Sequence, residues 1–243
     1  MRHSTAFGTK VLMCVLGTLA LTMTLRASDD EGFKSLFNGK DLTGWEGNPK
    51  LWSVKDGMIV GQTTKENPTK GNTFLILKDQ KFKDFEIRAI CKLEGMNSGI
   101  QYRSKVIDPA NWVMAGYQCD INPGPDNYCK LYQERMRGRI AMPGEVVTMD
   151  AEGKKNVTGT VPEPDKVKTA EKKGDWNEVV VIAKGNHLIQ KLNGVVIVDL
   201  TDNDERPDKG RTMDGLLGLQ IHAGGPMTIT FKEIKIKELP ADK

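Results

Sequence analysis

The 243-residue sequence predicts an all-β protein, a sandwich or jelly roll of two antiparallel sheets with one long polar loop. Three observations predict this class. Short runs of alternating apolar and polar residues recur along the chain, Gly, Asn and Asp fill the turns between them, and no long amphipathic helical pattern occurs. A hydrophobic content of 38% is enough for one sizeable core, so we expect one domain.

The N-terminal residues 1–27 have the pattern of a secretory signal peptide. Arg2 precedes a 15-residue apolar run, and Ala27 offers a small residue for cleavage. The run is short for a membrane span. An uncleaved N-terminal anchor is the alternative, because Arg26 makes the cleavage site imperfect. We expect a periplasmic or secreted protein without stable membrane insertion after cleavage.

The charge balance argues against a nucleic-acid partner. Residues 1–27 contain three of the 35 Lys and Arg residues and none of the 32 Asp and Glu residues, so the remaining chain is formally neutral. The basic stripe typical of a nucleic-acid-binding protein is missing from the sequence.

Three cysteines follow the predicted signal peptide. An odd number leaves at least one thiol unpaired, and Cys119 and Cys129, which flank the turn-rich segment DINPGPDNY, are the pair that the spacing favours for a disulfide. Cys91 lies inside a strand pattern, where a buried free thiol is the common outcome. No CxxC pair is present to indicate a cysteine metal site.

Strand patterns follow one another along the chain. Two short alternating runs surround Asp56-Gly57, a hairpin dipeptide, and residues 85–93 alternate for the length of one strand. Residues 176–200 contain three strand-like runs, which are separated by residues 184–186 and by Asn193-Gly194. Because Asn-Gly supplies the positive φ angles of a type I′ turn, this region predicts an antiparallel meander.

The C-terminal strand pattern has a break in its alternation. Ile229 and Phe231 alternate, and Ile234 then resumes one position out of step. This predicts a β-bulge near Lys232 and Glu233.

Residues 142–175 interrupt the regular spacing of strands. The segment is mostly polar, shows little periodicity and contains three prolines. It predicts a long surface loop, which is either a functional lid or an insertion without a role.

Four of the strand patterns have one apolar face and one face of hydrogen-bonding side chains. Outer faces of sandwiches usually carry Lys, Glu and Thr, whereas amides, Arg and His donate and accept in fixed geometry, which suits a polyol. If the strands are neighbours, these faces form one cleft; otherwise they form a solvated sheet face. The recurrence favours the cleft. The polar residues are Gln101, Arg103, Gln118, Asp120, Tyr132, Glu134, Gln220 and His222.

Six segments, in order, resemble the 3-keto-disaccharide hydrolase (3-keto-glycoside hydrolase/lyase) domain family. They are residues 33–45, 51–61, 97–104, 131–141, 174–200 and 216–239. The resemblance covers a domain of residues 32–239. It implies a concanavalin A-like sandwich and an exported bacterial enzyme. Members of the family cleave glycosides whose glucose unit carries a ketone at C3, by elimination with or without hydration.

The implied chemistry needs a base, a cation and groups that orient the sugar. A C3 ketone acidifies the C2 proton, so a base removes it and expels the group at C1. Glu134 or His222 is the candidate base. Arg103 is the candidate that stabilises the enolate oxygen, and Asp120 orients hydroxyls or helps to protonate the leaving group. The candidates for binding the 3-keto sugar or glycoside are Asn97, Gln101, Gln118, Tyr132, Gln220 and Arg137.

Two of these assignments have alternatives. Arg137 belongs to RMRGR, which is either a regular strand facing away from Glu134 or a loop over the cleft. Asp120, Glu134 and His222 form a divalent metal site if their tips converge, and the metal would then polarise the ketone; otherwise they are hydrogen-bonded. No other cofactor is expected.

Other functions remain possible for the same sandwich. A non-catalytic carbohydrate-binding module is the main alternative, and a structural envelope domain follows if the polar face is shallow. An ordinary glucanase is disfavoured because Pro123 stands where the second Glu of a Glu-x-Asp-x-x-Glu strand would fall.

Overall fold

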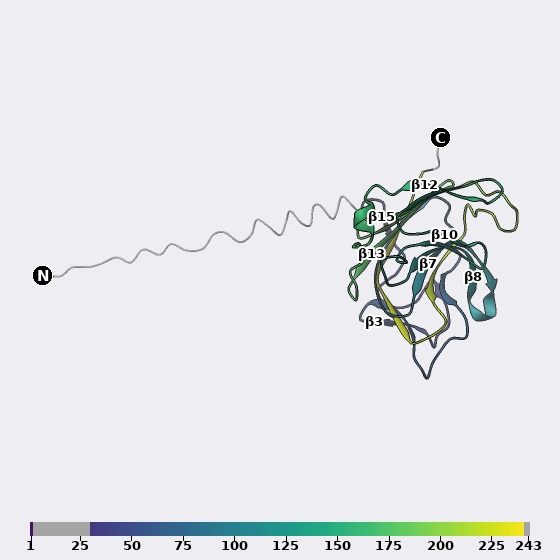
Figure 1. The fold of residues 1–243 in the computed structure, drawn as a ribbon. Helices are drawn as coiled ribbons and strands as arrows, with labels where there is room; N and C mark the ends of the chain where they lie inside the picture. The colour runs from purple at the N-terminus through teal and green to yellow at the C-terminus, as the bar shows by residue number, and fades with distance from the viewer. Residues whose placement is uncertain (2–29, 241–243) are drawn as a thin grey trace. The chain divides into compact units, whose positions relative to one another are not determined.

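The computed structural model describes Met1 and residues 30–240, and the chain from Lys34 onward forms one compact unit. This unit is a sandwich of two β-sheets (Figure 1), which confirms the predicted fold class. The predicted signal peptide, residues 1–27, lies outside the described residues apart from Met1. In the described part of the chain no helix is long and apolar enough to cross a membrane.

The larger sheet has ten strands in the order β12-β11-β15-β14-β13-β6-β17-β4-β3, and β1 pairs with β17. Neighbouring strands are antiparallel except for β11 and β15, which are parallel. The strands are β1 (Lys34–Ser35), β3 (Trp52–Lys55), β4 (Met58–Thr63), β6 (Phe85–Gly95), β11 (Glu145–Met149), β12 (Lys155–Thr160), β13 (Asn177–Lys184), β14 (His187–Leu192), β15 (Val195–Asp202) and β17 (Met227–Glu238).

The smaller sheet has seven antiparallel strands in the order β10-β9-β8-β7-β16-β5-β2. The strands are β2 (Trp45–Glu46), β5 (Thr73–Leu77), β7 (Ser98–Asp108), β8 (Val113–Ile121), β9 (Leu131–Glu134), β10 (Gly138–Ala141) and β16 (Leu216–Ile221). Two short helices, the 3₁₀ helix η1 (Pro109–Asn111) and α2 (Pro164–Val167), complete the described elements.

The turns and the bulge read from the sequence are confirmed. Asn193 and Gly194 have φ angles of 49° and 85° and join β14 to β15, as a type I′ turn requires. Asp56-Gly57 joins β3 to β4 in the same way. The pairing of β17 with β6 shifts register between Phe231 and Glu233, where the bulge is expected.

Residues 142–175 differ from the prediction. Instead of one long loop, they form β11, β12 and α2, and they extend an edge of the ten-stranded sheet. Val147 and Met149 of β11 are buried in the core, whereas every residue of β12 is exposed. A strand exposed along its whole length has no apolar alternation, so its residues carry no strand pattern. The segment belongs to the sheet opposite the polar face described below.

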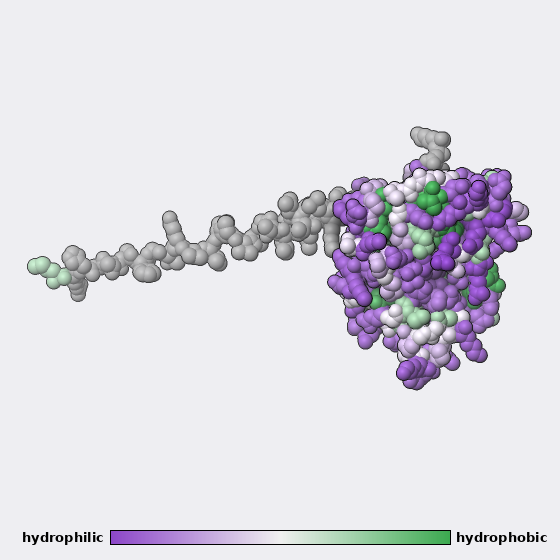
Figure 2. Space-filling model, in the orientation of Figure 1, coloured by the Kyte–Doolittle hydropathy of each residue, from purple (hydrophilic) through white to green (hydrophobic). Residues whose placement is uncertain are grey.

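Apolar side chains from both sheets fill the space between them. The Tyr102 and Tyr117 rings stack at 5.6 Å between centroids, and Phe85 meets Tyr102 edge-on at 6.2 Å. The surface visible in Figure 2 is mainly hydrophilic, with small separate apolar patches, as is usual for a folded domain.

The predicted Cys119–Cys129 disulfide is wrong. Both cysteines and Cys91 are fully buried free thiols in the core, where they pack as small apolar side chains. Burial raises the pKa of Cys91 to about 12, so this thiol stays protonated and unreactive.

Candidate active site

The outer face of the seven-stranded sheet contains a polar hollow of about 340 Å³. Its walls come from β8, β9, β10 and β16 and from the turns that precede β5, β7 and β9. The lining residues are Asn72, Asn97, Gln118, Asp120, Lys130, Tyr132, Glu134, Arg139, Gln220 and His222.

Strand register places several of these side chains in one row. Gln101 of β7 lies opposite Gln118 of β8, which lies opposite Tyr132 of β9, which in turn lies opposite Arg139 of β10. Gly99 allows this packing, because a Cβ atom there would be 2.6 Å from Gln118 Cδ. The Gln118 side chain therefore lies across the glycine of the neighbouring strand.

The sheet curls strongly enough to bring its distant strands together. Three strands separate β9 from β5, yet Asn72 Nδ2, just before β5, donates to Glu134 Oε1 of β9 at 3.3 Å. This curl makes the face concave and buries Glu134, which is only 7% exposed. Burial raises the Glu134 pKa, and the hydrogen bond from Asn72 partly opposes that rise.

A chain of hydrogen bonds connects Glu134 to His222. The backbone N–H of Ala223 donates to Asn72 Oδ1 at 3.0 Å, and His222 Nδ1 lies 2.5 Å from the Ala223 carbonyl oxygen. A carbonyl oxygen only accepts, so we assign the proton to Nδ1, which leaves the lone pair of the neutral ring on Nε2. Asn72 thus bonds to Glu134 and to the backbone of the residue that follows His222.

An ion pair forms another wall of the hollow. Lys130 Nζ lies 2.6 Å from Asp120 Oδ2, and the two side chains are 9% and 5% exposed. Gln118 Nε2 donates to Asp120 Oδ1 at 3.0 Å and lies 3.4 Å from Gln220 Oε1. The hollow therefore holds a buried cation next to a carboxylate that is already oriented.

Several buried amide atoms at the hollow lack a hydrogen-bond partner among the described residues. They are Asn97 Oδ1, Gln118 Oε1, Gln220 Nε2 and, beside Gln118, Gln101 Oε1. Buried polar groups in folded proteins are nearly always paired, because an unpaired one costs about 1–3 kcal/mol. Both donors and acceptors are represented, as binding of a polyhydroxylated ligand requires.

The structure brings together seven of the ten predicted site residues: Asn97, Gln118, Asp120, Tyr132, Glu134, Gln220 and His222. It adds Asn72, Lys130 and Arg139, which the strand patterns did not predict. Lys130 and Asn72 lie in turns immediately before strands, where the alternation of apolar and polar residues does not predict which way a side chain points. Arg139 lies opposite Tyr132, so correct pairing of LYQE with GRIA would have identified it.

The prediction that Arg103 lines the cleft is wrong. Arg103 has a φ of 45°, and the pairing of β7 with β8 shifts register just after Tyr102, so the alternation of faces ends there. Its guanidinium donates to the carbonyl oxygens of Lys83 and Gly185 at 2.6 to 2.8 Å and pairs with Asp84 at 3.2 Å. Arg103 links the two sheets and does not line the hollow.

Arg137 and Gln101 also have other surroundings than predicted. The Arg137 guanidinium is held by Asp202 and Asp204 at 2.5 and 2.9 Å, so its donors are occupied, although the residue lines a neighbouring hollow with Tyr132 and Glu134. Gln101 belongs to the row but is fully buried and does not line the hollow, and its Nε2 donates to the Gly116 carbonyl oxygen at 3.1 Å.

The candidate metal ligands do not form a ligand set. Asp120, Glu134 and His222 line the same hollow, but within residues 30–240 no group of three or more His, Cys, Asp or Glu side chains is arranged to hold an ion. Asp120 pairs with Lys130, and Glu134 hydrogen-bonds to Asn72.

Comparison with known proteins agrees with this fold. The model of the 3-keto-alpha-glucoside-1,2-lyase-like domain family matches residues 32–237. The chain belongs to this family. Membership supports a carbohydrate-active role for the protein. A search of curated proteins finds no match.

Solved structures with the same fold include proteins of several kinds. A Parabacteroides distasonis protein provisionally assigned to the glycosyl hydrolases has 24% identity and a TM-score of 0.58, with 88% of this chain and 97% of that chain covered. The Bacillus subtilis carbohydrate-binding module CBM66 has 13% identity and a TM-score of 0.51, with 80% and 96% covered. A Bacillus subtilis protein of unknown function with a galectin-like fold has 11% identity and a TM-score of 0.52, with 88% and 93% covered. These likenesses show the fold alone.

Proposed function

We propose that this protein cleaves the glycosidic bond of 3-keto-glucosides by removing the C2 proton and expelling the group at C1. Family membership and the unpartnered amide atoms of the hollow support this proposal. The observation that carries it is the joint presence of a buried carboxylate with raised pKa and a buried cation in a sugar-sized hollow.

The reaction is an elimination that balances without an oxidant. The base takes the C2 proton, and the C–H electron pair gives an enolate whose charge lies on the C3 oxygen. When the enolate collapses, the C3 carbonyl is restored, a C1–C2 double bond forms and the C1–O bond breaks. The leaving oxygen takes a proton and departs as an alcohol. Water then adds across the C1–C2 double bond where the net outcome is hydrolysis.

Glu134 is the residue that we assign as base. Its pKa is raised mainly because the side chain is buried, so its carboxylate is a stronger base than an exposed glutamate. Asn72 fixes one carboxylate oxygen and leaves the other for substrate. His222, which lines the same hollow, is the residue that we assign to pass a proton to the leaving oxygen.

Lys130 is the residue that we assign to the enolate. It replaces Arg103 in this role, because Lys130 is the cation buried in the wall of the hollow. Asp120 holds the ammonium group in place, and fixed cationic donors stabilise developing negative charge best where water is scarce. Arg139, which is exposed at the rim, contributes a second positive charge.

Export is part of the same proposal. The predicted signal peptide of residues 1–27 supports a periplasmic or secreted enzyme that meets its glycosides outside the cytoplasm.

The deciding experiment supplies the purified protein with methyl 3-keto-glucoside and, separately, with unoxidised methyl glucoside. We expect methanol release from the keto sugar alone, and slower release when C2 carries deuterium. Equal release from both sugars without an isotope effect would contradict elimination. Binding of the keto sugar without release would instead support a carbohydrate-binding module.

A further inference from the structure

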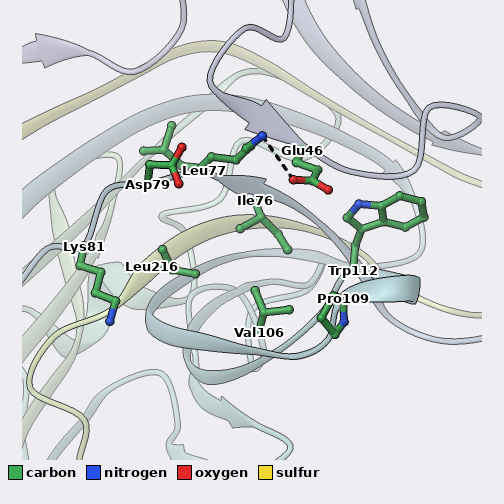
Figure 3. Close-up of a pocket in the computed structure, with 10 residues that line it drawn as sticks. Glu46, Ile76, Leu77, Asp79, Lys81, Val106, Pro109, Trp112 and Leu216 are labelled. Carbon is green, nitrogen blue, oxygen red and sulfur yellow. Dashed lines mark ion pairs between the residues drawn. The ribbon is translucent and has the colours of Figure 1, made fainter.

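A second, apolar pocket of about 610 Å³ lies on the same outer face of the seven-stranded sheet. Figure 3 shows Ile76, Val106 and Leu216 around its middle and the indole of Trp112 at one side. The charges at its mouth are of both signs, and Lys78 pairs with Glu46 at 3.6 Å. The proposed reaction makes no use of this pocket.

The apolar pocket and the polar hollow are built on the same strands. In β16, Leu216 lines the pocket and Gln220 lines the hollow, and the two are four residues apart on one face. Asn72, just before β5, lines the hollow, and Ile76 of β5 lines the pocket. Four residues of strand span about 13 Å, which is the distance between the two sites along the sheet.

The end of β7, the helix η1 and the start of β8 lie over the face between the two sites. We call these residues, 106–114, the strap. Its Trp112 carbonyl oxygen accepts from the Phe74 N–H at 2.9 Å, and Met114 packs on Gly218, where a Cβ atom would lie 2.5 Å from the Met114 sulfur. The strap is therefore fixed to the sheet floor, and the two sites remain separate cavities.

A third hollow of about 510 Å³ lies beside the strap. It shares Asn72 with the polar hollow and Trp112 with the apolar pocket. The three hollows are therefore neighbours on this face. This arrangement argues for one substrate with two ends rather than for two unrelated ligands.

The lining of the apolar pocket defines what occupies it. Its volume lies in the range of small-molecule sites and is too small for a folded segment of another protein. The paired charges at its mouth favour an uncharged group. Trp112 Nε1 is buried and has no hydrogen-bond partner among the described residues, so it can donate to an oxygen on the occupant.

We propose that the apolar pocket binds an uncharged ring at the far end of the leaving group. The preferred substrates are then amphiphilic 3-keto-glycosides, whose leaving group has a polar unit of about one sugar followed by an aromatic or alicyclic ring. This inference rests on the proposed function, because it names the leaving group of that reaction.

The test compares the methyl and naphthyl glycosides of one 3-keto-disaccharide. Binding is measured by titration calorimetry and turnover by release of the leaving group. We expect the naphthyl compound to bind about tenfold more tightly, as burial of a ring predicts, and to have a lower KM at equal kcat. Leu216→Ser should remove this preference. Trp112→Phe, which keeps a ring and loses the N–H, should reduce it.

Ile107→Ser is the matched control, because Ile107 is an exposed residue of the same strap that does not line the pocket. It should keep the full naphthyl preference. Equal affinity for both compounds with normal turnover would overturn the inference and leave the proposed function intact. A naphthyl preference without any turnover would overturn the proposed function instead. Sedimentation showing a dimer that Leu216→Ser dissociates would assign the pocket to a second copy of the chain and overturn the inference.

Discussion

The two cations Lys130 and Arg137 lie on either side of β9 in the seven-stranded sheet, and their surroundings differ. The Arg137 guanidinium points between the sheets and is bound by Gln133, Tyr117 and two aspartates of the ten-stranded side. Lys130 faces the outer hollow, where Asp120 is its ion-pair partner. A guanidinium whose donors are all used holds structure together, whereas the Lys130 ammonium, which pairs with Asp120 and donates to Asn127 Oδ1 at 3.4 Å, keeps one of its three donors for a ligand.

The same contrast separates the carboxylates. Asp202 and Asp204 are fully buried and bound by arginines, so their charges are neutralised in the folded state. Glu134 has only the half-exposed Arg135 as its ion-pair partner, at 3.5 Å, and burial raises its pKa in spite of that charge. The two buried aspartates are thus held by arginines inside the protein, whereas Glu134 meets its cation at the surface.

Glu134→Gln should have the largest effect on activity. Removal of a general base lowers kcat by about 10²- to 10⁴-fold, while the shape of the side chain is unchanged. Turnover of methyl 3-keto-glucoside is the measurement, and Glu94→Gln, at an exposed position of β6, is the control. Full activity of Glu134→Gln would transfer the role of base to His222.

The pH dependence of the free energy of unfolding provides a second check on Glu134, and its direction follows from the pKa shift. Because burial raises the folded-state pKa of Glu134, its contribution to stability is complete below the unfolded value near 4.5 and is lost as pH rises through the folded value. Gln does not titrate, so Glu134→Gln should remove this loss. Above the folded-state pKa of Glu134, the variant should therefore be no less stable than the unchanged protein. Urea unfolding across pH measures the difference.

Arg137→Met should have the largest effect on stability. Removal of one partner from a buried ion pair costs about 3–5 kcal/mol, because Asp202 remains buried without its cation. Arg139→Met is the matched variant two residues away on the outer face, and we expect a change within about 0.5 kcal/mol. Equal destabilisation by Arg137→Met and Arg139→Met would contradict the view that Arg137 holds the fold together and that Arg139, on the outer face, does not.

The fold was predictable because its signals are local. The Asn193-Gly194 turn and the bulge before Glu233 each follow from two or three neighbouring residues. The hairpin of β11 and β12 was missed because β12 is exposed along its whole length and carries no alternation.

The site was predictable only where strands stay regular. Gln118, Asp120 and Gln220 follow the period of two and reach the hollow as expected. The prediction for Arg103 is wrong because its positive φ ends the alternation of faces in β7. No residue type at this position indicates a positive φ. Asn72 meets Glu134 through the curl of the whole sheet, and that is a property of the tertiary structure.

Lys130→Met should lower kcat by about 10²-fold if its ammonium stabilises the enolate. Lys130→Arg keeps the charge and should recover part of this loss. The readout that separates catalysis from structure is KM, which we expect to change less than kcat, since the interaction strengthens as the enolate forms. An unchanged kcat with a raised KM would limit Lys130 to substrate binding.

Asn72→Ala should have the smallest effect and should appear in the pH profile. The Asn72 hydrogen bond lowers the Glu134 pKa against the rise caused by burial, so its loss moves the pKa further upward. A base works only when deprotonated, so the acidic limb of kcat/KM should move to higher pH, with about threefold to tenfold lower activity below the limb. At high pH, Glu134 is ionised in both proteins, and their activities should converge. A uniform loss at every pH would instead mean that Asn72 holds the geometry of the hollow without tuning Glu134.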